Sequence, residues 1–317
     1  MPICSSSPAN MKKPTWTIFL LTLFTLGSFA QTPEWTEYCQ IRDEINHNDY
    51  PPEIAYGMYC KMDSIYNGIP HFTDLYNFLS TAVACNEQEK TKELAFRIVR
   101  WKCWDSRFFS QSKLEAIKQL DFWPKLDSLS QINGEKRQYT DYMLALYEMR
   151  ISDQQCRQAL HGELTREESD SVWRIIHHTD SLNLNRLKEL IAEYGFPTWE
   201  KVSYDYALCA WLVAQHADSA FLHMYVEQLK KAVADNNANP ANLAYMIDRD
   251  LMNRNLPQLY GTQFIGVYND EGVMENMLWP VENMEQLNAR REHMLLPPMD
   301  TTGIKIYELD RDIRFLH

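Results

Sequence analysis

Apolar residues recur every three or four positions along most of the chain, and short polar segments separate these stretches. Such spacing places apolar side chains on one face of an α-helix, so each stretch predicts an amphipathic helix. In the first half the separating segments, such as NHNDYPP and NGIPHF, are rich in turn-forming residues. We therefore expect helical hairpins, with helices over residues 35–47, 51–66, 72–85 and 88–104 and shorter pieces to 130.

The second half, from about residue 139, has the same periodicity and clearer start and stop signals. Thr165 and Glu168 form a T-x-x-E capping box that starts one helix, and Gly195 suits the left-handed residue that ends it. Asn239, directly before a proline, is a typical N-cap for a later helix. The predicted helices of this half cover residues 139–160, 165–194, 203–234, 240–253 and 283–293.

One segment of the second half favours a β-hairpin. QFIGVY, at 263–268, predicts a short strand, and the NDEG segment that follows predicts a hairpin turn. The tail at 301–317 is expected to form a strand or an ordered strap, and the polar segment 128–138 marks a boundary between a helical region at 31–130 and a helical domain at 139–300. With only 10 glycines in the chain, the predicted fold class is mainly all-α, with a small β-hairpin or irregular element.

The helices between residues 75 and 129 resemble a degenerate tetratricopeptide-type unit, carried by LYNFLSTAVACNEQEKTKELAFRIVRW and LDFWPKLDSL. No clean second copy follows at the 34-residue spacing of such repeats, so a plain helical bundle is the alternative. In either case these helices are the predicted surface for a protein or peptide partner.

Polar residues interrupt the apolar faces of the predicted helices in the second half. A buried carboxylate without a partner costs about several kcal/mol, so we expect these groups to meet each other at one interior site. The alternative is a satisfied network that fixes the helix register without chemistry. The interrupting residues are Gln154, Arg157, Asp180, Asn183, Gln215, His216, Asp218 and Asp248.

The polar positions also follow a recognisable order: DQQCR at 153–157, DSLN at 180–183, YGFP at 194–197, AWLVAQHAD at 210–218, LAYMIDR at 243–249, QLYGTQ at 258–263 and ARR at 289–291. In this order they resemble a bacterial family of unknown function, DUF6624, over about residues 140–300. Phe196 stands where the family usually has tryptophan. The resemblance implies a shared helical domain, often exported and sometimes preceded by tetratricopeptide-like helices, and implies no established activity.

Two kinds of chemistry fit these residues. His216 can serve as a general base beside Asp180 or Asp248, while Arg249 or Arg290 binds an anion or oxyanion. Residues 258–263 form a second candidate, because a glycine, hydroxyl groups and amides there suit a polar ligand such as a sugar, a peptide or an amide. Paired histidines at helical spacing and phosphate-binding glycine patterns are absent from the sequence, so no metal site is predicted and the cofactor stays unassigned.

The sequence thus predicts a polar ligand-binding or catalytic pocket in a protein of uncharacterised activity. The alternative is a non-enzymatic helical scaffold whose inward polar residues form a structural network. The predicted catalytic residues are His216, Asp248 and Arg249. The predicted ligand-binding residues are Gln154, Arg157, Asp180, Asn183, Gln215, Asp218, Gln258, Tyr260, Gly261, Thr262, Gln263, Arg290 and Arg291.

Charge and the start of the chain bear on partners and location. A formal net charge of −12, with no run of basic residues, repels phosphate backbones and excludes nucleic acid as a partner. From Met11 the sequence has two lysines, an apolar stretch at 16–26 and small residues at Ser28 and Ala30, which predicts a signal peptide over 1–30. The stretch is shorter than the roughly 20 residues of a membrane span, so we expect export to the periplasm or medium, without a membrane span after cleavage. An uncleaved anchor is the alternative.

Export also changes how the cysteines are interpreted, because an oxidising compartment permits disulfides. Cys39–Cys60 and Cys85–Cys103 are the candidate bridges between neighbouring helices, although spacing alone does not fix connectivity. Cys209 lies within an uncharged run and is predicted to be a small buried apolar residue.

Overall fold

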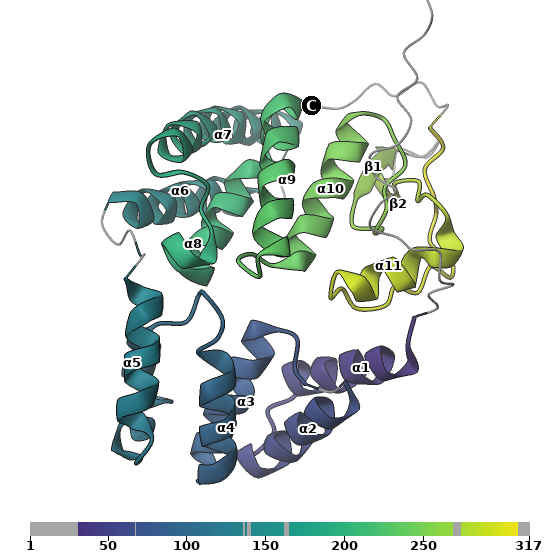
Figure 1. The fold of residues 1–317 in the computed structure, drawn as a ribbon. Helices are drawn as coiled ribbons and strands as arrows, with labels where there is room; N and C mark the ends of the chain where they lie inside the picture. The colour runs from purple at the N-terminus through teal and green to yellow at the C-terminus, as the bar shows by residue number, and fades with distance from the viewer. Residues whose placement is uncertain are drawn as a thin grey trace, which may run out of the picture.

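The structure is a computed structural model that describes residues 31–66, 68–135, 137, 141–161, 165–268 and 274–309. These residues form α-helices, short 3₁₀ helices and one antiparallel pair of strands (Figure 1). The predicted fold class, mainly all-α with a small β-hairpin, is confirmed. The predicted leader over 1–30 and the NDEG turn lie outside the described residues.

The first half begins with four α-helices, each of which packs against the next in sequence. Helix α4 ends before residue 104, the predicted end, because the fully buried Trp104 and the Asp105 cap start a different segment. The Asp105 side chain accepts from the N–H of Arg107 at 3.0 Å and opens a 3₁₀ helix. The elements of this half are α1 (Pro33–His47), α2 (Pro52–Ile65), α3 (Phe72–Ala84), α4 (Gln88–Ile98), η1 (Ser106–Ser110), η2 (Glu115–Gln119) and α5 (Trp123–Gly134), which covers much of the predicted boundary segment.

Helices α6 (Asp141–Gln158) and α7 (Arg166–Tyr194) pack against each other in the second half, with a short 3₁₀ helix, η3 (Ala159–His161), after α6. The capping box predicted for α7 is confirmed: Thr165 Oγ1 accepts from the N–H of Glu168, and the Glu168 carboxylate accepts from the N–H of Thr165. Gly195 follows α7 with φ 79°, which suits a glycine, and its carbonyl accepts from the Tyr142 hydroxyl at 3.0 Å.

The single helix predicted over 203–234 is wrong, because the structure divides it into α8 (Trp199–Ala214) and α9 (Ser219–Ala234). Residues 215–217 form the turn, and the Asp218 side chain caps α9 by accepting from the N–H of Phe221 at 2.9 Å. Helix α8 is itself kinked at the buried Ser203, which has φ 69°. The polar residues that interrupt the apolar run are therefore the connection between two helices.

The remaining chain packs beside α9. Asn239 caps α10 (Pro240–Asn253) as predicted. Strands β1 (Phe264–Tyr268) and β2 (Met274–Leu278) pair antiparallel, so the predicted strand and hairpin are confirmed. The short 3₁₀ helix η4 (Met284–Gln286) leads into α11 (Leu287–His293). The tail then returns to β2, where the N–H of Tyr307 donates to the carbonyl of Leu278 at 2.8 Å.

The two halves contact each other at the start of α1 and at the segment after α4. Near α11, the Trp35 indole donates to the carbonyl of Leu296 at 2.9 Å, and the Thr32 hydroxyl donates to Glu292 at 2.6 Å. At the start of α8, Trp199 is buried in the core of the first half, with its ring 5.6 Å from that of Trp101. These contacts place the second half in a fixed position on the first.

All six described cysteines are free thiols, so neither candidate disulfide forms in the structure. Cys39 and Cys103 are buried core residues, and burial raises the pKa of the Cys39 thiol to about 11. Cys209 is buried as predicted. Across the described part of the chain, every helix is too short or too polar to cross a lipid bilayer.

The turn between α8 and α9 generates a test. Asp218→Ala removes the acceptor for the N–H of Phe221 and is expected to lower the free energy of unfolding by about 1 kcal/mol in urea denaturation. Asp218→Asn keeps an acceptor and is expected to stay within about 0.5 kcal/mol of the natural chain. Equal stability of the alanine variant and the natural chain would contradict a role for the cap.

Candidate functional site

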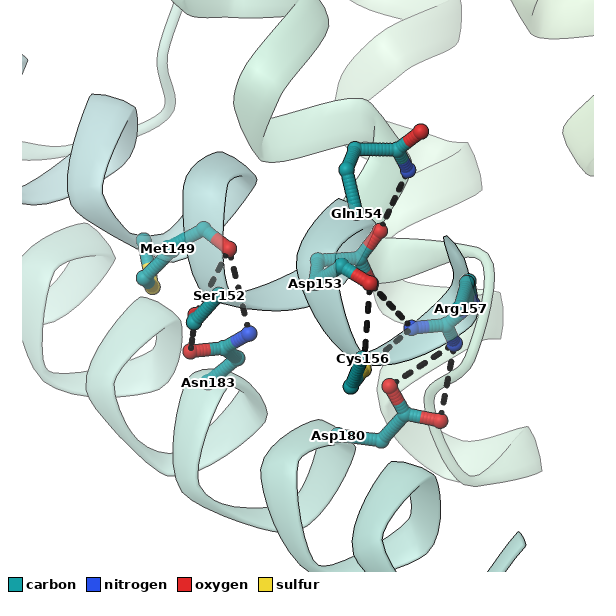
Figure 2. A network of polar contacts seen from close by, with 8 residues as sticks. All are labelled: Met149, Ser152, Asp153, Gln154, Cys156, Arg157, Asp180 and Asn183. Carbon is teal, nitrogen blue, oxygen red and sulfur yellow. Dashed lines mark hydrogen bonds and ion pairs between the residues drawn. The ribbon is translucent and has the colours of Figure 1, made fainter. Parts of the chain in front are cut away.

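Arg157 on α6 joins the carboxylates of Asp153 and Asp180 (Figure 2). Its Nη1 donates to Oδ1 of Asp153 at 2.8 Å, and its Nη2 donates to the two oxygens of Asp180 at 2.8 and 3.0 Å. The second oxygen of Asp153 accepts from the Gln154 amide at 2.7 Å. Asp153 is only 1% exposed, so Arg157 supplies the countercharge that a buried carboxylate requires. This network fixes the end of α6 against the middle of α7.

Asn183 makes a second polar tie between α6 and α7, on the same side of α7 (Figure 2). Its Nδ2 donates to the carbonyl of Met149 at 3.2 Å, and its Oδ1 accepts from the Ser152 hydroxyl at 3.1 Å. The side chain is buried, and its amide group both donates and accepts a hydrogen bond. Asn183 therefore sets the register of the two helices.

His216, in the turn after α8, lies near this network. The residue is exposed, but its imidazole is partly desolvated by neighbouring groups. This desolvation lowers the pKa of His216 below the ordinary value. The positive charge of Arg157 lowers the pKa further, while the charges of Asp180 and Asp153 oppose the shift. The imidazole is therefore neutral near pH 7 and can accept a hydrogen bond or a proton.

Arg249 on α10 is the second cation near His216, and its charge also lowers the pKa of that imidazole. Burial lowers the pKa of the Arg249 guanidinium, which remains protonated at neutral pH. Its Nε is buried and has no hydrogen-bond partner among the described residues. A buried guanidinium donor without an acceptor is costly, so this atom has unused capacity to bind an acceptor.

Asp248 precedes Arg249 and is directed into a different part of the domain. Its carboxylate accepts from the N–H of Leu259 at 2.8 Å, of Tyr260 at 3.1 Å and of Thr262 at 3.0 Å, and from the Thr262 hydroxyl at 2.9 Å. Burial raises the pKa of Asp248, while these donors oppose the shift. Asp248 is fully buried and its acceptor positions are occupied, so in this arrangement it anchors the loop at 258–263.

The loop residues bond mainly to one another and to the neighbouring backbone. Gln258 is fully buried: its amide donates to the carbonyls of Gln263 and Trp279, and it accepts from the N–H of Gln263. Gly261 has φ 64°, a conformation that favours glycine, so it allows the chain to turn under α11. Burial raises the pKa of the Tyr260 hydroxyl to about 12, and the charge of Asp248 adds to this.

Arg290 and Arg291 on α11 bind backbone carbonyls of the same loop. Nε of Arg290 donates to the carbonyl of Leu259 at 2.7 Å, and Nη1 of Arg291 donates to the carbonyl of Tyr260 at 2.6 Å. Burial lowers the pKa of both guanidinium groups. The loop at 258–263 is thus held from two helices. Asp248 on α10 accepts from its N–H groups, and Arg290 and Arg291 on α11 donate to its carbonyls.

The predicted site residues therefore fall into three groups. His216 and Arg249 lie beside the network of Gln154, Arg157 and Asp180, and Asn183 belongs to the same α6–α7 contact. A second group surrounds the loop and consists of Asp248, Gln258, Tyr260, Gly261, Thr262, Gln263, Arg290 and Arg291. Gln215 and Asp218 form the third group, in the α8–α9 connection, where Asp218 is exposed and pairs with Lys188 at 3.0 Å.

Sequence reasoning missed two polar residues. Asp153 continues the buried spacing of Leu146 and Met149, which was the signal that could have found it. Asp250 is buried and contacts Nδ1 of the exposed His223 at 3.2 Å, a pair with no clear sequence signal. Within the described ranges no three His, Cys, Asp or Glu side chains are grouped closely enough to hold a metal ion.

An enclosed hollow lies elsewhere, between α8, α9 and the start of α10. Aromatic side chains line it, including Phe196, Tyr204 and Trp211, and none of the predicted site residues does. This hollow therefore lies apart from the predicted polar site. Near His216, by contrast, the buried Nε of Arg249 has no hydrogen-bond partner among the described residues.

The loop anchor generates a second prediction. Asp248→Asn replaces one acceptor oxygen by an amide donor, which faces N–H groups, so the free energy of unfolding is expected to fall by at least about 2 kcal/mol in urea denaturation. Asp180→Asn, a matched change at a partly exposed carboxylate, is expected to cost less. A fully stable Asp248→Asn protein would contradict the anchoring role.

Comparison with known proteins identifies the family of the chain. The sequence model of a family of unknown function, DUF6624, matches residues 140–312, from the start of α6 to the tail beyond β2. No curated protein and no solved structure matches the chain. Because the match covers more than half of the 317 residues, the chain belongs to the DUF6624 family, a family of unknown function.

Proposed function

We propose that the protein binds a small anionic ligand between His216 and Arg249. The observation that carries this proposal is the buried Nε of Arg249, which has no acceptor in the described part of the chain. An anionic oxygen at this position would supply the missing acceptor and the countercharge together. Its chemical class is a carboxylate, sulfate or phosphate group.

The charges around the site support an anion. Asp153 and Asp180 are paired with Arg157, which uses both terminal nitrogens on them. Both carboxylates thus have Arg157 as their countercharge, and within the described residues Arg249 has no carboxylate within ion-pair distance. The neutral His216 adds a hydrogen-bonding group that can also take a proton from a ligand or water. General-base chemistry at His216 is the catalytic form of this proposal.

A titration of the histidine side chains by NMR tests the site, with sulfate as the probe. In the natural chain His216 is expected to titrate below about 6.5, the ordinary value, and sulfate is expected to raise its pKa because a nearby anion stabilises the imidazolium. Arg249→Gln is expected to raise the pKa of His216 without sulfate, since a positive charge is removed, and to abolish the sulfate effect.

Two controls accompany that titration. Chloride at the same ionic strength measures general screening, and His223, exposed on α9, reports any change that is not specific to the site. A sulfate effect that is equal at His216 and His223, or unchanged in Arg249→Gln, would refute the anion site.

The second candidate function is a helical interaction protein in which the polar residues are structural. Two observations favour an interaction protein. The carboxylates of Asp153 and Asp180 are already paired within the domain, and apolar residues are exposed on the helices of the first half. Ile132 is 58% exposed on α5, with Leu129 one turn before it, and Ile54 is 52% exposed on α2. This function predicts that sulfate leaves His216 unaffected.

We also propose that the chain is exported, on the evidence of the leader sequence at 1–30. When the full chain is expressed in a bacterium, the protein is expected outside the cytoplasm with Gln31 as its first residue, as measured by fractionation and intact mass. A cytoplasmic protein that retains the leader would contradict this proposal.

A further inference from the structure

Among the described residues, no strand pairs with the outer edge of β1 in the β-hairpin. β1 pairs with β2 from Phe264 opposite Leu278 to Tyr268 opposite Met274, and among the described residues the sheet has only these two strands. The tail forms an isolated bridge to the other side of β2 at Ile306. Half of the backbone N–H and C=O groups of β1 therefore point away from the sheet, as they do along any edge strand.

Nothing in the sequence of β1 blocks pairing along this edge. The strand reads FIGVY and contains no charge and no proline, the residues by which edge strands normally prevent association. Phe264 is 45% exposed and Met274, on the paired strand, is 62% exposed, so apolar surface accompanies the open edge. A hairpin of two strands is marginal by itself, and a third strand would stabilise it.

The strand is complementary to a second copy of itself. If two β1 strands pair antiparallel about Gly266, then Gly266 faces Gly266, and Ile265 faces Val267 of the other copy. β-branched side chains opposite one another are favourable cross-strand pairs. The acidic residue of the described hairpin, Glu275, contacts Lys305, so it brings a countercharge with it.

We propose that two copies of the chain associate edge to edge through β1 and form a continuous four-stranded antiparallel sheet. The occupant is a second copy rather than an unrelated peptide, because the same five residues satisfy both sides of the pairing with no charge opposed to charge. The paired segment is only five residues long, so we expect a weak dimer whose population depends on concentration. The formal charge of −12 opposes association, and physiological salt screens that repulsion.

Gly266 is the position that tests the pairing, because any side chain placed there faces its own copy. A Cβ at this position would meet the flexible Met274 side chain at 3.2 Å, and Gly266 does not have a positive φ, so substitution is compatible with the hairpin. Gly266→Lys and Gly266→Glu each place like charges opposite one another, which disfavours the pair. Mixing the two variants places opposite charges together.

Sedimentation velocity at physiological salt measures the outcome. The natural chain is expected to dimerise with increasing concentration, each charged variant to remain monomeric, and the equimolar mixture of the two to form a heterodimer. Gly266→Thr, an uncharged control, is expected to retain the dimer. Far-ultraviolet circular dichroism confirms that each variant is folded. A natural chain that stays monomeric, or charged variants that dimerise alone, would overturn the proposal, as would a mixture that fails to associate.

Discussion

The Asp248 carboxylate is the interaction on which the second half of this fold depends. A buried carboxylate must find donors, and here they come from three successive parts of one loop, Leu259, Tyr260 and Thr262. Arg290 and Arg291 then bind the loop carbonyls from α11. The contacts continue from α11 to the first half, because Glu292 on the same helix accepts from the Thr32 hydroxyl. One buried charge thus organises a loop, a helix and the contact between the two halves.

The same turn of α10 presents three charged residues in three directions. Asp248 anchors the loop, Arg249 lies near His216, and Asp250 contacts His223 on α9. Of the three, Arg249 has the buried nitrogen that lacks an acceptor, while its helix is held firmly from the other side. A rigid helix that carries an unsatisfied cation next to a neutral imidazole is a preorganised place for an anion.

Sequence reasoning succeeded where the physical signal is local. The Thr165 capping box and the Asn239 cap are formed within a few residues, so their patterns specify helix starts directly. It failed at the α8–α9 connection, because the apolar spacing resumes directly after the polar turn and Asp218 continues the stripe of Leu208 and Leu212. The cap itself was the missing signal, since Asp218 bonds only three residues ahead.

The site was less predictable than the fold, because partner choice depends on tertiary packing. The helical stripe indicated that Asp248 points inward, and the residue is indeed buried, but its bond to Thr262 spans 14 positions and crosses the irregular chain after α10. Asp153 was overlooked although it is the most buried carboxylate of the α6–α7 network. Periodicity predicts which residues are interior, whereas it does not predict which of two nearby polar groups a given residue will bond.

The most direct measurement is a crystal structure of the protein grown in sulfate. The account predicts a sulfate oxygen within about 3 Å of Nε of Arg249, with His216 beside the same anion and Asp248 still bonded to the loop. A structure in which Nε of Arg249 bonds to a protein group, and no anion lies near His216, would contradict it.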